Sequence, residues 1–119
     1  MNQQEMKRRT KEFSLRVIHL CQELPNDYVS RRIGDQLLRS GTSVGANYRA
    51  ACRARSPKEF IAKLGIVEEE ADEAMFWMET LIESNIVPEQ LIKPLLEEAN
   101  EILSIIVTTI RTARSNLKK

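Results

Sequence analysis

Residues 37–81 constrain the fold most strongly, because they contain the end of one helical pattern followed closely by the start of another. The second pattern opens with a strong start signal: Ser56 in the N-cap position, Pro57 at the first helical position, and Glu59 three residues after the cap. A short connection between two long helices favours antiparallel neighbours. This stretch therefore predicts two long helices packed side by side.

One further helix is predicted on each side of this pair. A first helix over about residues 5–23 has apolar residues spaced by four and three positions, and it ends at Pro25-Asn26-Asp27, where proline and turn-forming residues stop it. The remaining helices are predicted over about residues 30–54, with Ser30 as N-cap, and over 57–84 and 88–115. Pro94 predicts an irregular first turn in the last helix. The expected fold is all-α: a single domain, residues 1–119, forming an antiparallel up-down-up-down four-helix bundle.

Composition narrows the class of protein further. Only four glycines and four prolines are present, too few for the many turns of an all-β domain. No apolar run approaches the roughly 18 residues that a membrane span needs, and the first residues lack the apolar centre of a signal peptide. The two cysteines, Cys21 and Cys52, fit a reducing compartment. We therefore expect a cytoplasmic protein with no membrane partner.

Charge is unevenly distributed along the chain, although the net charge is only +1. Residues 1–63 carry 13 Lys or Arg and 6 Asp or Glu, whereas residues 64–101 carry a single lysine and 11 acids. Residues 102–119 carry four bases and no acid. Such segregation indicates an electrostatic partner, which could be nucleic acid or another copy of the same chain.

Five arginines fall on one face of the predicted second helix, within roughly 260–360° when its core stripe lies at roughly 100–160°. A row of this kind could follow a phosphate backbone, because guanidinium groups bind phosphate through two parallel hydrogen bonds. A solvated polar face is an equally good interpretation. The candidate nucleic-acid-binding residues are Arg31, Arg32, Arg39, Arg49 and Arg53, supported by Arg55, Lys58 and Lys63.

Two aromatic residues and two glycines suggest contact with a second subunit. Phe76 and Trp77 fall outside the apolar arc of the third helix, and large aromatics are enriched in interfaces; a broad bundle that covers them is the alternative. Gly34 and Gly45 lie at the edge of the second helix's core stripe, where they could admit either a helix of the same chain or one of another copy.

The sequence contains little that could support catalysis. His19 is the only histidine, and no Glu-x-x-His pair, P-loop or G-x-G-x-x-G motif is present. The two cysteines lie 31 positions apart without a CxxC, which argues against a zinc site. We therefore expect no enzyme, no metal site, no cofactor and no small-molecule substrate.

The segment SGTSVGANYRAACRARS, followed by EFIAKLGIVEEEADEAMFWMETL, resembles the bacterial intervening-sequence proteins, a family of four-helix bundles encoded in insertions within large-subunit ribosomal RNA genes. Ser43 and Asn47 match the polar pair of the family's helix-two motif, and Arg39 matches its preceding basic position. Arg49-Ala50-Ala51 stands where many members have an acid. The resemblance implies a homopentamer. It also implies a distant relationship to the accessory protein of diversity-generating retroelements, a basic pentamer that works with a reverse transcriptase and RNA.

Two hypotheses for function follow. The first is a non-enzymatic homo-oligomer, with the homopentamer coming from the resemblance, that associates with RNA or a nucleoprotein through the basic face of helix two. The second is a structural or protein-interaction module without a nucleic-acid role. In the second, the arginines of helix two meet the carboxylates of helix three in the neighbouring subunit.

Overall fold

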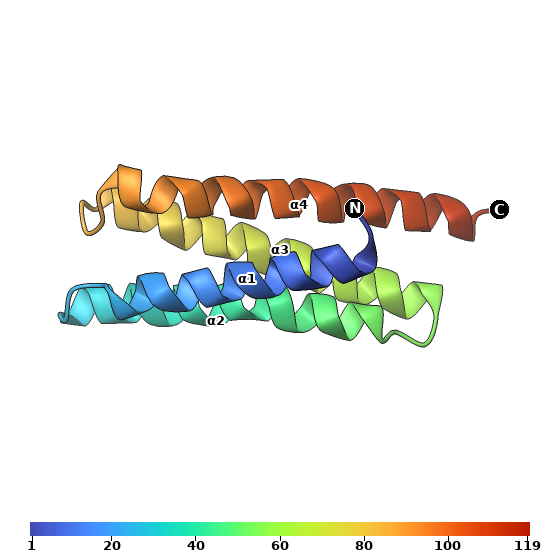
Figure 1. The fold of residues 1–119 in the computed structure, drawn as a ribbon, viewed down its shortest axis with the longest axis horizontal. Coiled ribbons are helices and arrows are strands. Elements are labelled where there is room, and N and C mark those ends of the chain that lie inside the picture. The colour runs from blue at the N-terminus through green and yellow to red at the C-terminus, as the bar shows by residue number, and fades with distance from the viewer.

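The computed structural model describes residues 1–119 and contains four helices: α1 (Gln3–Gln22), α2 (Tyr28–Cys52), α3 (Pro57–Glu83) and α4 (Glu89–Leu117). Consecutive helices run antiparallel and form an elongated bundle of 52 × 21 × 20 Å (Figure 1). Each helix packs closely on the next along the chain, whereas α1 and α4, which close the bundle, pack least closely of the four neighbouring pairs. The predicted all-α four-helix bundle is confirmed.

The start of α3 is confirmed, and the start of α2 is corrected. Ser56 caps α3 by accepting a hydrogen bond from the Glu59 N–H at 3.1 Å, and the Glu59 carboxylate accepts one from the Arg55 N–H at 2.9 Å. Ser30 is not the N-cap of α2, as predicted from the sequence. Asp27 takes that position, and its carboxylate accepts hydrogen bonds from the N–H of Ser30 at 2.9 Å and from its hydroxyl at 3.0 Å. These bonds to the carboxylate lower the pKa of Asp27.

The irregular first turn predicted for the last helix is present, because α4 opens with an i+3 hydrogen bond from the Leu91 N–H to the Pro88 carbonyl at 3.1 Å, whereas the other three helices open with i+4 bonds. Beyond this turn α4 continues through Pro94 without a break. Pro94 and Gln90 are both exposed, so the carbonyl of Gln90 that loses its helical donor lies on the solvent side. The preceding turn is predicted correctly. Asn85 adopts a left-handed backbone with φ of 61°. The carbonyl of Leu81 accepts hydrogen bonds from the N–H groups of Ile86 and Val87, the two residues that follow Asn85.

Glycines in α2 allow α1 to approach closely. A Cβ atom at Gly41 would lie 2.6 Å from Val17 Cγ1, and one at Gly45 would lie 2.8 Å from Ser14 Oγ. The Ser14 hydroxyl donates to the Gly41 carbonyl at 2.9 Å and accepts from the Gly45 N–H at 3.2 Å. A Cβ atom at Gly34 would likewise meet Leu24 at 2.9 Å. Gly45 therefore admits α1 of the same chain, and Gly34 admits Leu24 of the connection that follows α1.

The core runs the length of the bundle and draws on all four helices. Its largest fully buried side chains are Phe13, Val17, Leu37, Val44, Leu64, Val67, Met78, Leu81, Ile92, Ile102 and Ile106. None of the four helices has a stretch apolar enough to cross a bilayer.

Candidate functional site

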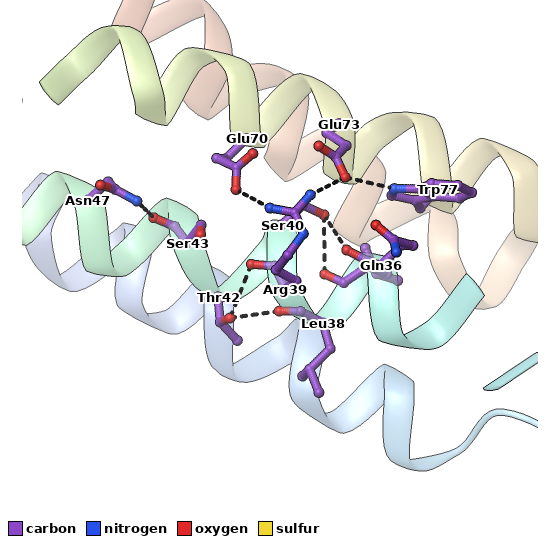
Figure 2. A network of polar contacts seen from close by, with 11 residues as sticks. Gln36, Leu38, Arg39, Ser40, Thr42, Ser43, Asn47, Glu70, Glu73 and Trp77 are labelled. Atoms are coloured by element: carbon purple, nitrogen blue, oxygen red, sulfur yellow. Dashed lines mark hydrogen bonds and ion pairs between the residues drawn. The ribbon is translucent and has the colours of Figure 1, made fainter. Parts of the chain in front are cut away.

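Arg39, the centre of the predicted arginine row, is bound within its own chain. Its guanidinium group lies against two carboxylates of α3: Nη1 is 2.8 Å from Glu70 Oε2, and Nη2 pairs with Glu73 (Figure 2). The hydrogen bond from Arg39 lowers the pKa of Glu73, and the same contact raises the pKa of Arg39. One arginine of α2 therefore meets carboxylates of α3 inside a single copy.

Trp77 belongs to the same network. Its indole N–H donates to Glu73 Oε2 at 3.1 Å, and its half-buried ring packs against the core (Figure 2). Contact with a second subunit is therefore not the only role open to Trp77, because the bundle itself covers part of the ring.

Phe76, in contrast, points to solvent, with 56% of its surface exposed. Its ring packs edge-on against Trp77, with centroids 4.9 Å apart and an interplanar angle of 79°. The exposed face of α3 around it carries four carboxylates that form no ion pair within the chain: Glu69, Asp72, Glu79 and Glu83. An exposed aromatic ring among free carboxylates is suited to a partner that is apolar at its centre and basic at its edge.

The other arginines of α2 separate into two groups. Arg31 donates to Asn26 Oδ1 at 2.8 Å, and Arg32 pairs with Asp35 at 3.4 Å while lying over the ring of Tyr28. Arg49 and Arg53, near the opposite end of the helix, are exposed and form no ion pair. The same holds for Arg55 and Lys58 in the loop and first turn that follow, and Lys63 is half-buried without an ion pair. The row is thus not one uniform basic face.

The antiparallel topology gathers most of the positive charge at one end of the molecule. This basic end, where both termini and the α2–α3 loop lie (Figure 1), consists of residues 1–9, 45–67 and 103–119. It contains 12 of the 18 Lys and Arg residues and 2 of the 17 Asp and Glu residues. Three further acids lie at its border: Glu98 and Glu101 pair with Arg9, and Glu68 lines the same cavity as Arg111. The remainder of the bundle holds the other 6 bases and 15 acids. The molecule is therefore strongly polarised along its long axis.

A cavity of about 420 Å³ opens between α3 and α4 toward this basic end. Its polar lining includes Arg111, Arg114, Lys118 and Ser115, with Glu68 as the single acid. These bases of α4 are absent from the residues predicted to bind nucleic acid. The excess of bases in residues 102–119 is the available sequence signal, but the sequence alone does not place them at the same end of the bundle as the α2–α3 loop.

A family model of the 23S rRNA-intervening sequence proteins matches residues 2–108. The chain belongs to this family. Among solved structures, this intervening-sequence protein is similar to a protein of unknown function from the S23 ribosomal protein family of Bacteroides thetaiotaomicron. The two are 33% identical, with a TM-score of 0.85, and the similarity covers 93% of this chain and 99% of the other. No curated protein matches.

The family's polar pair lies on the side of α2 that faces α3 in this intervening-sequence protein (Figure 2). The Asn47 side-chain amide donates to the Ser43 carbonyl at 3.0 Å, and both residues are half-buried. Arg39, at the preceding basic position, lies two helical turns away from Asn47 and bridges to α3. Of the motif residues, Arg39 therefore links α2 to α3, whereas the hydrogen bond of Asn47 to Ser43 stays within α2.

Proposed function

We propose that this intervening-sequence protein is a non-enzymatic homo-oligomer that associates with RNA through its basic end. The observation that carries the proposal is the concentration of 12 of the 18 Lys and Arg residues in residues 1–9, 45–67 and 103–119. Binding to a phosphate backbone depends mainly on such clustered cations, because each contact releases condensed counterions. The family's name, which refers to 23S rRNA, supports the association with RNA. Self-association is supported by what the sequence resemblance implies, a homopentamer.

The phosphate contacts are assigned to basic residues that the bundle leaves unpaired. Arg53, Arg55 and Lys58 meet this condition among the residues predicted from the sequence, and Arg111 and Arg114 join them from α4. Arg49 and Lys63 are also unpaired but are left out of this set, because Arg49 lines the cavity between α1 and α2 and Lys63 is half-buried. Arg39 is excluded from this set because Glu70 and Glu73 already neutralise it. Arg31 and Arg32 are excluded because they lie toward the acidic end of the molecule, where a polyanion would be repelled.

Fluorescence anisotropy with a labelled single-stranded RNA of about 20 nucleotides tests this proposal. We expect affinity to fall steeply with salt, with a slope of about −0.7 per phosphate contact in a plot of log affinity against log salt. The variant Arg55→Gln/Arg114→Gln should bind about tenfold more weakly and reduce the slope by about 1.4. The matched control Arg16→Gln/Lys93→Gln removes two exposed bases outside the basic end and should change affinity less than about threefold.

RNA binding that is absent at low salt, or flat in salt, would contradict the proposal. Equal losses of RNA affinity in the variant and its control would also contradict the proposal, because they would show that binding depends on the net charge of the protein and not on the basic end.

A structural module without RNA is the second candidate function, and the exposed Phe76 with its free carboxylates favours it. Size-exclusion chromatography with light scattering and two-wavelength absorbance separates the candidates. Co-purifying nucleic acid supports the first, and a clean oligomer supports the second. The variant Arg53→Glu/Arg55→Glu should break the oligomer if these arginines pair with a neighbouring subunit, and should abolish RNA binding while sparing the oligomer if they contact phosphate.

A further inference from the structure

An exposed apolar groove runs along the outer surface between α1 and α2. Two adjoining cavities, of about 250 and 550 Å³, share Ile18 in their linings. Leu15 lines the smaller cavity and is 46% exposed, and Leu38 lines the larger one and is 39% exposed. The middle of the groove therefore presents an uncovered apolar floor large enough for an aromatic side chain.

Both ends of this groove are basic. Lys7, Lys11 and Arg49 line the end toward the chain's N-terminus, where no acid is present in the lining. Arg31 and Arg32 line the other end, where the only acid is Asp35, already paired with Arg32 at 3.4 Å. The groove thus selects for a partner with an apolar centre and negative charge on both sides of it.

The outer face of α3 has this complementary pattern. Phe76 stands at its centre, with Glu69 and Asp72 before it in the helix and Glu79 and Glu83 after it. Asp72 and Glu79 lie four and three residues from Phe76, and Glu69 and Glu83 lie seven residues from it. At these spacings the four carboxylates and the Phe76 ring share one face of the helix. A helix of this kind can lie lengthwise in a groove, as amphipathic helices do when they dock.

Phe76 and the centre of the groove lie at the same level along the bundle. Phe76 is three residues from Glu73, which pairs with Arg39, and Arg39 is next to Leu38 in the groove. The part of α3 after Phe76 runs toward the end of the molecule where α2 begins (Figure 1). Two copies placed side by side in the same direction therefore bring Glu79 and Glu83 toward Arg31 and Arg32.

We propose that the outer face of α3 in one copy docks into the α1–α2 groove of a second copy, with Phe76 as the apolar anchor. The inference rests on the self-association in the proposed function and names its two surfaces. At the other end of the contact, Glu69 and Asp72 meet Lys7, Lys11 and Arg49. The two surfaces are different, so the contact is heterologous and repeats from copy to copy until it closes a ring.

Light scattering during size exclusion tests this docking. The wild-type protein should have a mass of several subunits. Phe76→Glu, which removes the anchor, and Leu15→Glu, which places a charge on the groove floor, should each give monomers with unchanged helical circular dichroism. Leu91→Glu is the matched control: Leu91 is 68% exposed on α4, outside both surfaces, and this variant should keep the wild-type mass.

Mixing the two monomeric variants distinguishes a heterologous contact from a symmetric one. The Phe76→Glu protein keeps an intact groove, and the Leu15→Glu protein keeps an intact Phe76, so an equimolar mixture should form a one-to-one dimer that cannot grow further. A symmetric interface that uses both surfaces at once would leave the mixture monomeric.

A wild-type monomer, an unchanged mass in either variant, dissociation of the Leu91→Glu control, or no dimer on mixing would each overturn the docking. RNA anisotropy measured on the same proteins is a separate readout. Loss of RNA binding with an intact oligomer would contradict the RNA proposal and leave the docking standing. Salt-dependent RNA binding by a wild-type monomer would contradict the docking and leave the RNA proposal standing.

Discussion

Arg9 of α1 holds Glu98 of α4 in a two-pronged ion pair. Arg9 Nε lies 2.7 Å from Glu98 Oε2, and Arg9 Nη2 lies 2.8 Å from Glu98 Oε1. Glu101 adds a third contact at 2.9 Å from the same guanidinium group. The hydrogen bond to Glu98 raises the pKa of Arg9. This cluster joins the two helices that pack least closely and closes the bundle along that side.

Replacing Arg9 by methionine should lower the free energy of unfolding by about 1.5–3 kcal/mol, the range for hydrogen bonds to charged groups. The side chains of Arg9 and Glu98 are only 18% and 19% exposed, so the lost contacts are poorly replaced by water. Urea unfolding measures the change, and amide exchange in residues 3–9 should accelerate. Arg8→Met is the control: its pair with Glu12 spans 3.8 Å with a 70% exposed arginine side chain, and the loss should stay below about 0.5 kcal/mol. Equal effects of the two substitutions would contradict the assignment.

Replacing Gly41 and Gly65 by alanine should shift the free energy of unfolding in opposite directions. Gly41→Ala would place a Cβ atom 2.6 Å from Val17 Cγ1, and such overpacking typically lowers the free energy of unfolding by about 1–3 kcal/mol. A Cβ atom at Gly65 would meet no other atom within 4 Å, so Gly65→Ala should raise stability by about 0.5–1 kcal/mol through helix propensity. Thermal and urea unfolding check both signs. A neutral or stabilising Gly41→Ala would show that α1 and α2 are not in close contact there.

Acid should weaken the link between α2 and α3. Arg39 lowers the folded-state pKa of Glu73, so this group stabilises the fold above its unfolded pKa of about 4.3 and loses that contribution as pH falls through the lower folded value. Urea unfolding from pH 6 to pH 3 should therefore show a shallower decline for Glu73→Gln than for the wild type. Glu97→Gln, which removes an exposed carboxylate without an ion pair, should keep the wild-type slope. Parallel curves for all three proteins would contradict this role for Glu73.

Cys21 should react slowly with alkylating agents. Burial raises the pKa of its thiol to about 11, and the thiol donates to the Gly34 carbonyl at 3.6 Å. Because the thiolate is the nucleophile, iodoacetamide should modify Cys21 in a Cys52→Ser variant roughly 10–100-fold more slowly than glutathione at pH 8. The rate should rise about tenfold per pH unit up to pH 10. Denaturation in urea should restore the ordinary rate, whereas a plateau near pH 9 in the folded protein would contradict the raised pKa.

Local signals explain which elements could be predicted. The start of α3 follows from Ser56 and Glu59, whose hydrogen bonds span four residues or fewer, so a short sequence window contains the whole interaction. The N-cap of α2 is misplaced by the sequence pattern because Asp27 and Ser30 are both good caps, and the choice depends on Ser30 being buried. The pair of Arg9 and Glu98 joins residues 89 positions apart, and no local pattern indicates it.

The sequence alone determined the four helices, their order and the uneven distribution of charge along the chain. It left open whether the bundle covers Phe76, which the structure leaves exposed. Only the tertiary structure decided where those charges meet in space. Consecutive helices run in opposite directions, so residues 45–67 and 103–119 reach the same end of the bundle, while most acids of α3 and α4 lie away from it. The structure likewise decided that Arg39 is neutralised by Glu73 while Arg53 stays free, because charge pairing depends on distances of a few ångströms between helices that the linear pattern does not contain.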